Sequence, residues 1–321
     1  MNRILVGDCL RTLQALPDAS VNCCVTSPPY WGLRDYGHDE QIGQEPTPAA
    51  FVASLVAVFA EVRRVLRDDG TLWLNLGDSY AANRGGTPMP AETLAGGVSG
   101  RGAIDAKRGR ESGYTPHRDP AAHGLKHKDL IGIPWRVAFA LQADGWYLRQ
   151  DIIWHKPNPM PESVTDRCTK AHEYLFLLAK SERYHYNAAA IAEDAARGAA
   201  VSRFDTGKTA THQGGRAQAG ERSDSATRNR RSVWTIQTQP FAGAHFAVMP
   251  EALVEPCILA GCPDGGTVLD PFCGSGTVPS VAARLGRRYI GCELNPDYAA
   301  MAERRIAADC GALFLAMQEM P

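Results

Sequence analysis

Two groups of residues in this 321-residue chain have the types and the spacing that chemistry requires. The first runs from Asp270 to Thr277, reads D-P-F-C-G-S-G-T, and follows a short apolar run at 267–269. Glycines at a strand-to-helix turn let a ligand approach the backbone closely. An acid at the end of the strand suits a ligand that carries a cationic amine. No lysine follows the glycines and a third glycine is missing, so neither a P-loop nor a dinucleotide turn is predicted.

A second acid completes this first group. Glu293 ends the next predicted strand, about twenty residues after the glycine turn, where an acid commonly hydrogen-bonds the hydroxyls of a ribose. A glycine turn with a ribose acid and no phosphate-binding lysine indicates a nucleoside cofactor. S-adenosylmethionine (AdoMet) fits that description.

The second group is the tetrapeptide Ser27-Pro28-Pro29-Tyr30, which follows an apolar run at 21–25 and precedes Trp31. Two prolines stiffen the backbone and lack N–H groups, so their carbonyls and Ser27 form a rigid set of acceptors. The two aromatic rings offer flat faces for stacking. This combination suits a planar ring with an exocyclic amine, although a plain strand-ending proline turn has the same composition.

Alternating strand and helix patterns surround both groups and must position them. Strands are predicted at 4–6, 21–26, 71–76, 147–154, 174–179, 267–269 and 288–292, with a turn at 69–70. Helices are predicted at 9–16, 48–66, 130–143, 251–260, 275–285 and 296–308. This alternation predicts an open α/β fold with a mainly parallel twisted sheet and helices on both faces.

Two basic segments, 81–128 and 196–232, interrupt this pattern. The net charge of −1 for the whole chain speaks against a nucleic-acid partner, but arginines and lysines are concentrated locally in these segments. Structureless loops of this length are usually functional or disordered. Solvated insertions and polyanion-binding segments are both open, and the local charge favours the second. The candidate contact residues are Arg84, Arg101, Arg108, Arg110, Arg203, Arg216, Arg228, Arg230 and Arg231.

The nine cysteines do not have the spacing of a metal site or a disulfide framework. Several lie in apolar runs, where cysteine acts as a small hydrophobe. Pro256-Cys257 falls within such a run and is expected in the core. The start of the chain does not resemble a signal peptide. Reduced cysteines in a cytoplasmic protein without a metal are therefore expected.

The motifs resemble those of AdoMet-dependent DNA amino-methyltransferases. Ser27–Tyr30 looks like their catalytic tetrapeptide, residues 270–277 look like their cofactor loop, and the order of the two resembles the permuted β class. Further segments at 7–9, 154–158, 172–174 and 245–250 look like other motifs of the family. The resemblance spans most of the chain and misses only the two basic segments.

The resemblance implies a Rossmann-like AdoMet-dependent methyltransferase fold with permuted motif order. The catalytic domain would comprise 1–80, 129–195 and 233–321, with inserted segments at 81–128 and at 196–232, the latter a candidate target-recognition region. The cofactor-binding residues would be Asp8, Thr26, His245, Phe246, Asp270, Phe272, Gly274, Ser275, Gly276, Thr277, Glu293, Leu294 and Asn295.

The implied reaction is methyl transfer to a base flipped out of duplex DNA. Tyr30 would stack on the base, while Ser27 and the carbonyl of Pro28 would accept hydrogen bonds from its amine. Transfer would be direct, with catalysis mainly from positioning and without a nucleophilic cysteine. Asp78 would either assist at the base or hold a loop, Phe272 would flank the cofactor or pack inward, and Trp154 is expected in the core.

Serine at the first tetrapeptide position tends to accompany cytosine N4 in this family, so Ser27 favours N4-methylcytosine. Adenine N6 methylation is the alternative, and a catalytically silent DNA-binding protein with an AdoMet fold is a second one. Expected partners are double-stranded DNA, a cognate restriction endonuclease and a second copy of the chain. The expected source is bacterial or phage-encoded.

Overall fold

The computed structural model describes residues 2–33, 38, 41–81, 124–194, 227–238 and 249–318, with side chains described as far as residue 311. Within these ranges, none of the helices combines the length and the apolar character needed to cross a bilayer. Eight of the predicted site residues lie outside the described residues: Arg84, Arg101, Arg108, Arg110, Arg203, Arg216, His245 and Phe246.

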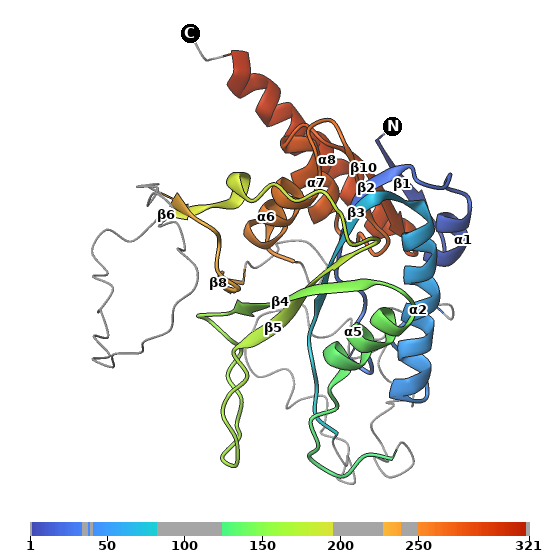
Figure 1. Ribbon diagram of the computed structural model, residues 1–321, viewed down its shortest axis with the longest axis vertical. Helices are drawn as coiled ribbons and strands as arrows, with labels where there is room; N and C mark the ends of the chain where they lie inside the picture. The colour runs from blue at the N-terminus through green and yellow to red at the C-terminus, as the bar shows by residue number, and fades with distance from the viewer. Residues whose placement is uncertain are drawn as a thin grey trace, which may run out of the picture.

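The described residues form one eight-stranded sheet in the order β1-β10-β9-β2-β3-β5-β4-β8 (Figure 1). Its strands are β1 (Arg3–Val6), β2 (Val21–Thr26), β3 (Leu66–Leu76), β4 (Tyr147–His155), β5 (His172–Ala179), β8 (Val233–Thr235), β9 (Thr267–Asp270) and β10 (Arg288–Glu293). β5 runs antiparallel to both neighbours, and the other pairs are parallel. The mainly parallel sheet predicted from the sequence is therefore confirmed.

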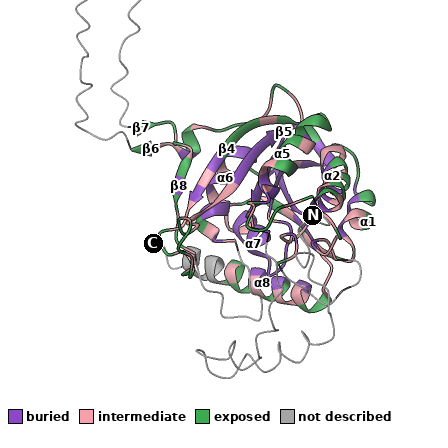
Figure 2. Ribbon diagram, turned by 90° about the horizontal axis from the view of Figure 1, so that it is seen from below, coloured by how far each residue is buried: buried purple, intermediate pink, exposed green. Residues whose placement is uncertain are grey.

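Helices cover this sheet on both faces. They are α1 (Cys9–Gln14), α2 (Pro48–Val65), α5 (Ile133–Ala143), α6 (Glu251–Gly261), α7 (Thr277–Arg284) and α8 (Pro296–Gln318). A 3-10 turn (Ala189–Ile191) precedes a separate two-stranded sheet of β6 (Glu193–Asp194) and β7 (Thr227–Arg228). Buried residues line the sheet and the inner sides of its helices, while exposed residues lie on the outer sides (Figure 2).

Alternation along the strands divides the core into two layers. Cys24 and Leu269 pack with α1, α2 and α5 on one face of the sheet. Their neighbours Cys23 and Val268 pack with α6 and α7 on the other. Successive side chains of a strand point to opposite faces, so a fully buried strand must be apolar on both. This explains why adjacent residues are both apolar in β2 (Cys23-Cys24) and in β9 (Val268-Leu269). Cys257 lies in the second layer, as expected.

Local chemistry explains where the helices begin. Thr47 accepts a hydrogen bond from the N–H of Ala50 and Pro48 occupies the first turn, so α2 starts with a capped end. The Asp78 carboxylate accepts from the N–H groups of Gly132 and Ile133 and thereby fixes the start of α5. Of the two roles expected for Asp78, the structure shows the one that holds a loop.

Three elements differ from the prediction. The predicted turn at 69–70 lies within β3 at a break in its pairing, because the register with β2 passes from Val21 opposite Leu66 to Cys23 opposite Thr71, and the N–H groups of Lys180 and His185, after β5, donate to the carbonyls of Gly70 and Asp69. β8 is not predicted because a strand of three residues is too short to show a periodic pattern of polar and apolar side chains. α8 runs past the predicted end at residue 308 to Gln318.

Gly261, at the end of α6, offers a test of how tightly the second layer is packed. A Cβ there would lie 2.4 Å from Trp73 Nε1 and 2.5 Å from Thr71 Oγ1. We expect Gly261→Ala to reduce the free energy of unfolding by about 1–3 kcal/mol through overpacking, measured by urea denaturation. Gly311→Ala is the matched control, because a Cβ at this glycine in α8 meets no atom within 4 Å. A control variant that loses as much stability would contradict this explanation.

Candidate active site

The site lies where two adjacent strands send the chain to opposite faces of the sheet. β2 and β9 pair in parallel, with Cys24 opposite Leu269. α2 follows β2 and packs on one face, whereas α7 follows β9 and packs on the other. Such a reversal opens a crevice at the carboxyl ends of the strands, where open α/β sheets bind their ligands.

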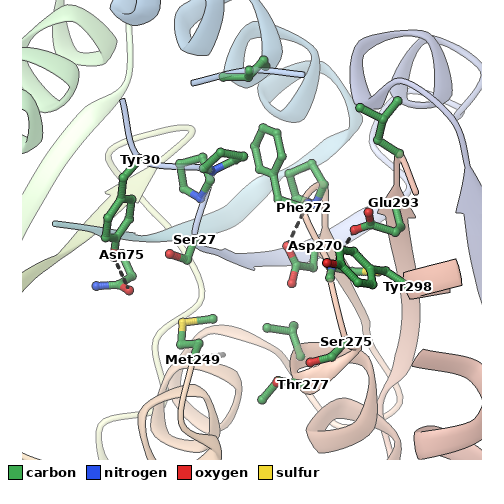
Figure 3. Close-up of a pocket in the computed structure, with 18 of the residues that line it drawn as sticks. Ser27, Tyr30, Asn75, Met249, Asp270, Phe272, Ser275, Thr277, Glu293 and Tyr298 are labelled. Carbon is green, nitrogen blue, oxygen red and sulfur yellow. Dashed lines mark hydrogen bonds between the residues drawn. The ribbon is translucent and has the colours of Figure 1, made fainter. Parts of the chain in front are cut away.

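A cavity of about 430 Å³ occupies this crevice. Its lining includes most of the predicted catalytic and cofactor-binding residues, namely Asp8, Ser27, Pro28, Pro29, Tyr30, Asp270, Phe272, Gly274, Ser275, Thr277, Glu293, Leu294 and Asn295. Figure 3 shows Tyr30 and Asn75 at one end and Glu293 and Tyr298 at the other, with Ser27 and Asp270 between them. The tetrapeptide and the glycine turn, about 240 residues apart, therefore line one continuous space.

Asp270 joins the two loops. Its Oδ1 accepts a hydrogen bond from Thr26 Oγ1 at 2.6 Å and another from the N–H of Phe272 at 3.0 Å. The side chain is almost fully buried, and this burial raises the pKa of Asp270 to about 7 despite the two hydrogen bonds. The negative charge of Glu293 also acts to raise this pKa. Thr26 was predicted to bind the cofactor, but it does not line the cavity. Its hydroxyl instead donates to Asp270.

Glu293 is held by backbone amides at both of its oxygens. Oε2 accepts from Gly274 at 2.8 Å, and Oε1 accepts from Asn295 at 2.9 Å. Each carboxylate oxygen retains a second lone pair, so the group can still accept from a pair of ligand hydroxyls. Burial raises the pKa of Glu293 above its ordinary value.

The glycine turn has the backbone conformation and the close packing expected of it. Gly274 and Gly276 have φ angles of 51° and 81°, in the left-handed region that favours glycine. A Cβ on Gly276 would lie 2.7 Å from the Cβ of Ala302. Gly276 therefore lets α8 pack against the turn and does not itself line the cavity. Phe272 combines both expected roles, since it lines the cavity and packs against the first core layer.

Two loop hydroxyls are fixed from α8. Arg305 donates to Thr277 Oγ1 at 2.9 Å and lies 3.5 Å from Ser275 Oγ. The same guanidinium pairs with Glu251 at the start of α6 at 2.6 Å. Arg305 on α8 therefore holds the hydroxyls of Ser275 and Thr277, which face the cavity. Gly276 in turn allows α8 to lie close enough for this contact.

At the opposite end of the cavity, three strands hold Tyr30. Its hydroxyl donates to Glu173 Oε2 on β5 at 2.6 Å, and Asn75 Nδ2 on β3 donates to the same oxygen at 3.2 Å. Lys156, directly after β4, forms an ion pair with Glu173. Burial and the adjacent Glu173 carboxylate raise the pKa of Tyr30 well above its ordinary value, so the phenol stays protonated and donates.

The surrounding residues leave the Tyr30 ring little freedom. A Cβ on Gly77 would lie 2.5 Å from its Cε2, so the ring lies directly against bare backbone there. The Lys156 ammonium lies 4.3 Å from the centre of the Trp154 ring. Trp154 itself is buried in the second core layer, as expected, and donates to the carbonyl of Ile236.

Sequence reasoning missed Glu173, Lys156, Asn75 and Met249 as residues of the cavity. Lys156, Glu173 and Met249 lie inside the segments that resemble family motifs, and Asn75 lies in the predicted strand at 71–76, but no spacing indicates that they meet. The one available signal was the charge of Glu173 at the start of the apolar strand β5. Among the described residues, no cluster of histidine, cysteine and acidic side chains could hold a metal ion.

The described arginines of the second basic segment are engaged at its base. Arg228 and Arg231 both pair with Glu193 Oε1, at 2.9 and 2.6 Å. Arg230 lies over the ring of Trp234, 4.4 Å from its centre. These contacts join β7 and the start of β8 to β6.

The switch-point crevice, the glycine turn and the ribose-type acid together define a Rossmann-like methyltransferase fold with permuted motif order. A model of the DNA methylase family, N6_N4_Mtase, matches residues 21–304, and the chain belongs to this family. It is accordingly a DNA methyltransferase.

Known proteins of high similarity are type II methyltransferases. M.Cfr9I of Citrobacter freundii is 48% identical over 303 residues, which cover 94% of this chain and 87% of that protein. M.SmaI of Serratia marcescens is 47% identical over 304 residues, covering 95% and 90%.

Solved structures of similar fold cover nearly the whole chain. The Thermus thermophilus protein TTHA0409, solved with S-adenosyl-L-methionine, is 25% identical with a TM-score of 0.58, covering 96% of this chain and 94% of that one. The PvuII DNA methyltransferase (cytosine-N4-specific) is 18% identical with a TM-score of 0.60, covering 95% and 86%, and shares the fold.

The contact between Tyr30 and Glu173 generates a testable expectation. Tyr30→Phe removes the donor hydroxyl, and Glu173→Gln removes the charge while keeping an acceptor. We expect each to lower kcat/KM for DNA methylation about tenfold, the kinetic equivalent of about 1.4 kcal/mol for a charge-assisted hydrogen bond. Because both variants remove the same charge-assisted hydrogen bond, the double variant should lose much less than a hundredfold.

Tyr184→Phe is the matched control, since that hydroxyl accepts from Arg149 at 3.1 Å and does not line the cavity. It should leave kcat/KM unchanged. Losses that multiply fully in the double variant would contradict the inferred coupling.

Proposed function

We propose that this enzyme transfers the methyl group of AdoMet to the exocyclic N4 amine of a cytosine flipped out of duplex DNA. One observation carries the proposal: the tetrapeptide and the glycine turn line a single cavity, with Ser27 and Asp270 between its two ends. A methyl donor and an acceptor amine that occupy the two ends would meet at that midpoint.

The end with Glu293 suits the adenosine of AdoMet. The free lone pairs of the Glu293 carboxylate can accept from the ribose hydroxyls, and Asp8, which caps α1, lines the same cavity. Asp270, Ser275 and Thr277 would hold the methionine end, whose charged groups need polar partners. The complex of the similar TTHA0409 with S-adenosyl-L-methionine supports AdoMet as the ligand.

The end with Tyr30 suits a flipped base. Ser27 and the carbonyl of Pro28 would accept the two hydrogens of the amine and turn its nitrogen toward the sulfonium methyl group. Bound AdoMet would supply the electrophilic methyl group: the amine nitrogen would form its bond to the methyl carbon as the carbon–sulfur bond breaks, the sulfonium would leave as a neutral thioether, and the proton released from the amine would pass to solvent. This chain supplies orientation, and a bound near-attack geometry accounts for much of such a rate enhancement.

The choice of cytosine N4 rests on Ser27. A serine hydroxyl is a neutral acceptor, whereas an aspartate at that position would accept more strongly from the amine. Adenine N6 is the competing assignment. The names of the relatives associate them with type II restriction–modification, which supports a sequence-specific duplex substrate and a cognate endonuclease for this enzyme. The arginines of the two basic segments would contact that duplex.

The product distinguishes the candidate functions directly. We expect DNA from a host that expresses the enzyme to contain N4-methylcytosine, detected by mass spectrometry after digestion to nucleosides. DNA from a host that expresses Ser27→Ala is the matched control and should contain far less. Only N6-methyladenine in the first sample would overturn the cytosine assignment, and neither base, despite AdoMet binding, would overturn methylation of DNA.

The raised pKa of Asp270 predicts a pH dependence of AdoMet binding. A cationic ligand favours the ionised carboxylate, which predominates in the free enzyme only above its pKa of about 7. The Kd for AdoMet should therefore rise as the pH falls from 8 to 6, by at most about tenfold per unit below the pKa. Calorimetric titration of the wild type and of Asp270→Asn tests this expectation. The asparagine side chain would stay neutral throughout, so a variant that keeps the full slope would contradict the role of Asp270.

A further inference from the structure

The connection between β4 and β5, residues 156–171, projects from the sheet as a long twisted loop (yellow-green in Figure 1). It carries Met160, whose exposed fraction of 83% is the highest among the large apolar side chains of the described residues. Met160 also lines the cavity that contains Ser27 and Tyr30. An apolar side chain is thus held in solvent at the mouth of the candidate active site.

The arm that bears Met160 is stiff. Prolines at 157, 159 and 161 alternate with Asn158 and Met160 and fix the backbone φ at three of five positions. Asn158 accepts from the N–H of Thr238 at 3.1 Å and donates to the carbonyl of the same residue at 3.4 Å. The exposure of Met160 therefore does not arise from a loosely held loop.

The rest of the loop is also fixed to the body of the protein. The N–H of Lys156 donates to the carbonyl of Ala171 at 2.8 Å and closes the base of the loop. Arg167 donates to Glu162 at 2.6 Å and lies 4.0 Å from the centre of the Tyr80 ring, just beyond β3. These contacts preorganise the loop, so placing its tip against a partner would require little further ordering.

The proposed function creates a need for such a side chain. Flipping a base out of a duplex costs a few kcal/mol of unstacking and unpairing, and it leaves a gap between the neighbouring bases. In other DNA-binding proteins, apolar side chains, methionine among them, insert as wedges between neighbouring base pairs. The polarizable thioether of methionine adapts well to aromatic surfaces. Because the flipped base would enter the cavity, the gap would lie at the cavity mouth.

We propose that Met160 is a DNA-wedging residue that enters the base stack at the place vacated by the target nucleotide. This assignment rests on the proposed methylation of a flipped base. Met160 would stabilise the flipped state without touching the reacting atoms.

Leu33 is the other strongly exposed apolar side chain of the cavity lining, with an exposed fraction of 58%. It lies in the turn that follows the tetrapeptide, where its N–H donates to the carbonyl of Tyr30 at 3.3 Å. It lacks the flanking prolines of Met160. It therefore serves as a competing candidate in the same experiment.

The test compares two duplexes that carry the enzyme's own target site, mapped from methylated host DNA. In one duplex the target base is paired normally, and in the other it faces an abasic site, so that flipping is already easy. We expect Met160→Ala to reduce kcat/KM about tenfold or more on the paired duplex, and less than about twofold on the other. Met160→Leu should restore wild-type behaviour.

Phe139→Ala removes a similarly exposed ring on α5, outside the cavity lining, and should be neutral on both duplexes. Met160→Ala overturns the inference if it equals the wild type on both duplexes or loses the same factor on both, as a general packing or contact role would produce. A selective loss in Leu33→Ala instead would also overturn it.

The wild type separates this inference from the proposed function. A wild type that methylates neither duplex overturns the proposed function, and the wedge with it. An active wild type combined with a non-selective Met160→Ala overturns the wedge alone. Unchanged affinity for AdoMet in Met160→Ala, measured by calorimetry, confirms that the variant retains an intact cofactor site.

Discussion

The hydrogen bond from Thr26 to Asp270 is the contact on which the site depends. It joins the carboxyl ends of β2 and β9, two parallel strands from opposite ends of the chain. The loop after β2 carries the tetrapeptide, and the loop after β9 carries the glycine turn. Because the helices that follow these strands leave on opposite faces, the two loops diverge around a shared space instead of packing against each other.

The same arrangement separates the charges of the cavity. Asp8, Asp270 and Glu293 lie in the part assigned to the cofactor, where a sulfonium and an amine would bring positive charge. In the part assigned to the base, the Glu173 carboxylate is paired with Lys156 and hydrogen-bonded by Tyr30. A buried ion pair contributes little to stability in general, and here it fixes an aromatic ring that must meet a planar substrate. The electrostatics thus favour the donor at one end and a neutral base at the other.

The sequence was sufficient to predict the local features. The glycine turn, the acid after β10 and the tetrapeptide each depend on a few adjacent residues, and the apolar runs predicted the parallel core strands. What could not be predicted depends on partners distant in the chain. Asp69-Gly70 has the composition of a turn, and hydrogen bonds from the segment after β5 hold it within β3 at the break in that strand's register. Glu173 and Lys156 meet Tyr30 only because β5 is inserted antiparallel between β3 and β4. The net charge of −1 proved uninformative because it averages over segments of opposite character.

In the proposed mechanism, one cavity brings the methyl donor and the acceptor amine together between Ser27 and Asp270. The most direct measurement is a crystal structure of the enzyme with an unreactive AdoMet analogue and a duplex that contains its target site. We expect adenosine hydroxyls at Glu293, the flipped base on Tyr30, and the base amine within about 3.5 Å of the position of the transferable methyl group. An analogue bound with its adenosine against Tyr30, or a base whose amine points away from Ser27, would contradict this mechanism.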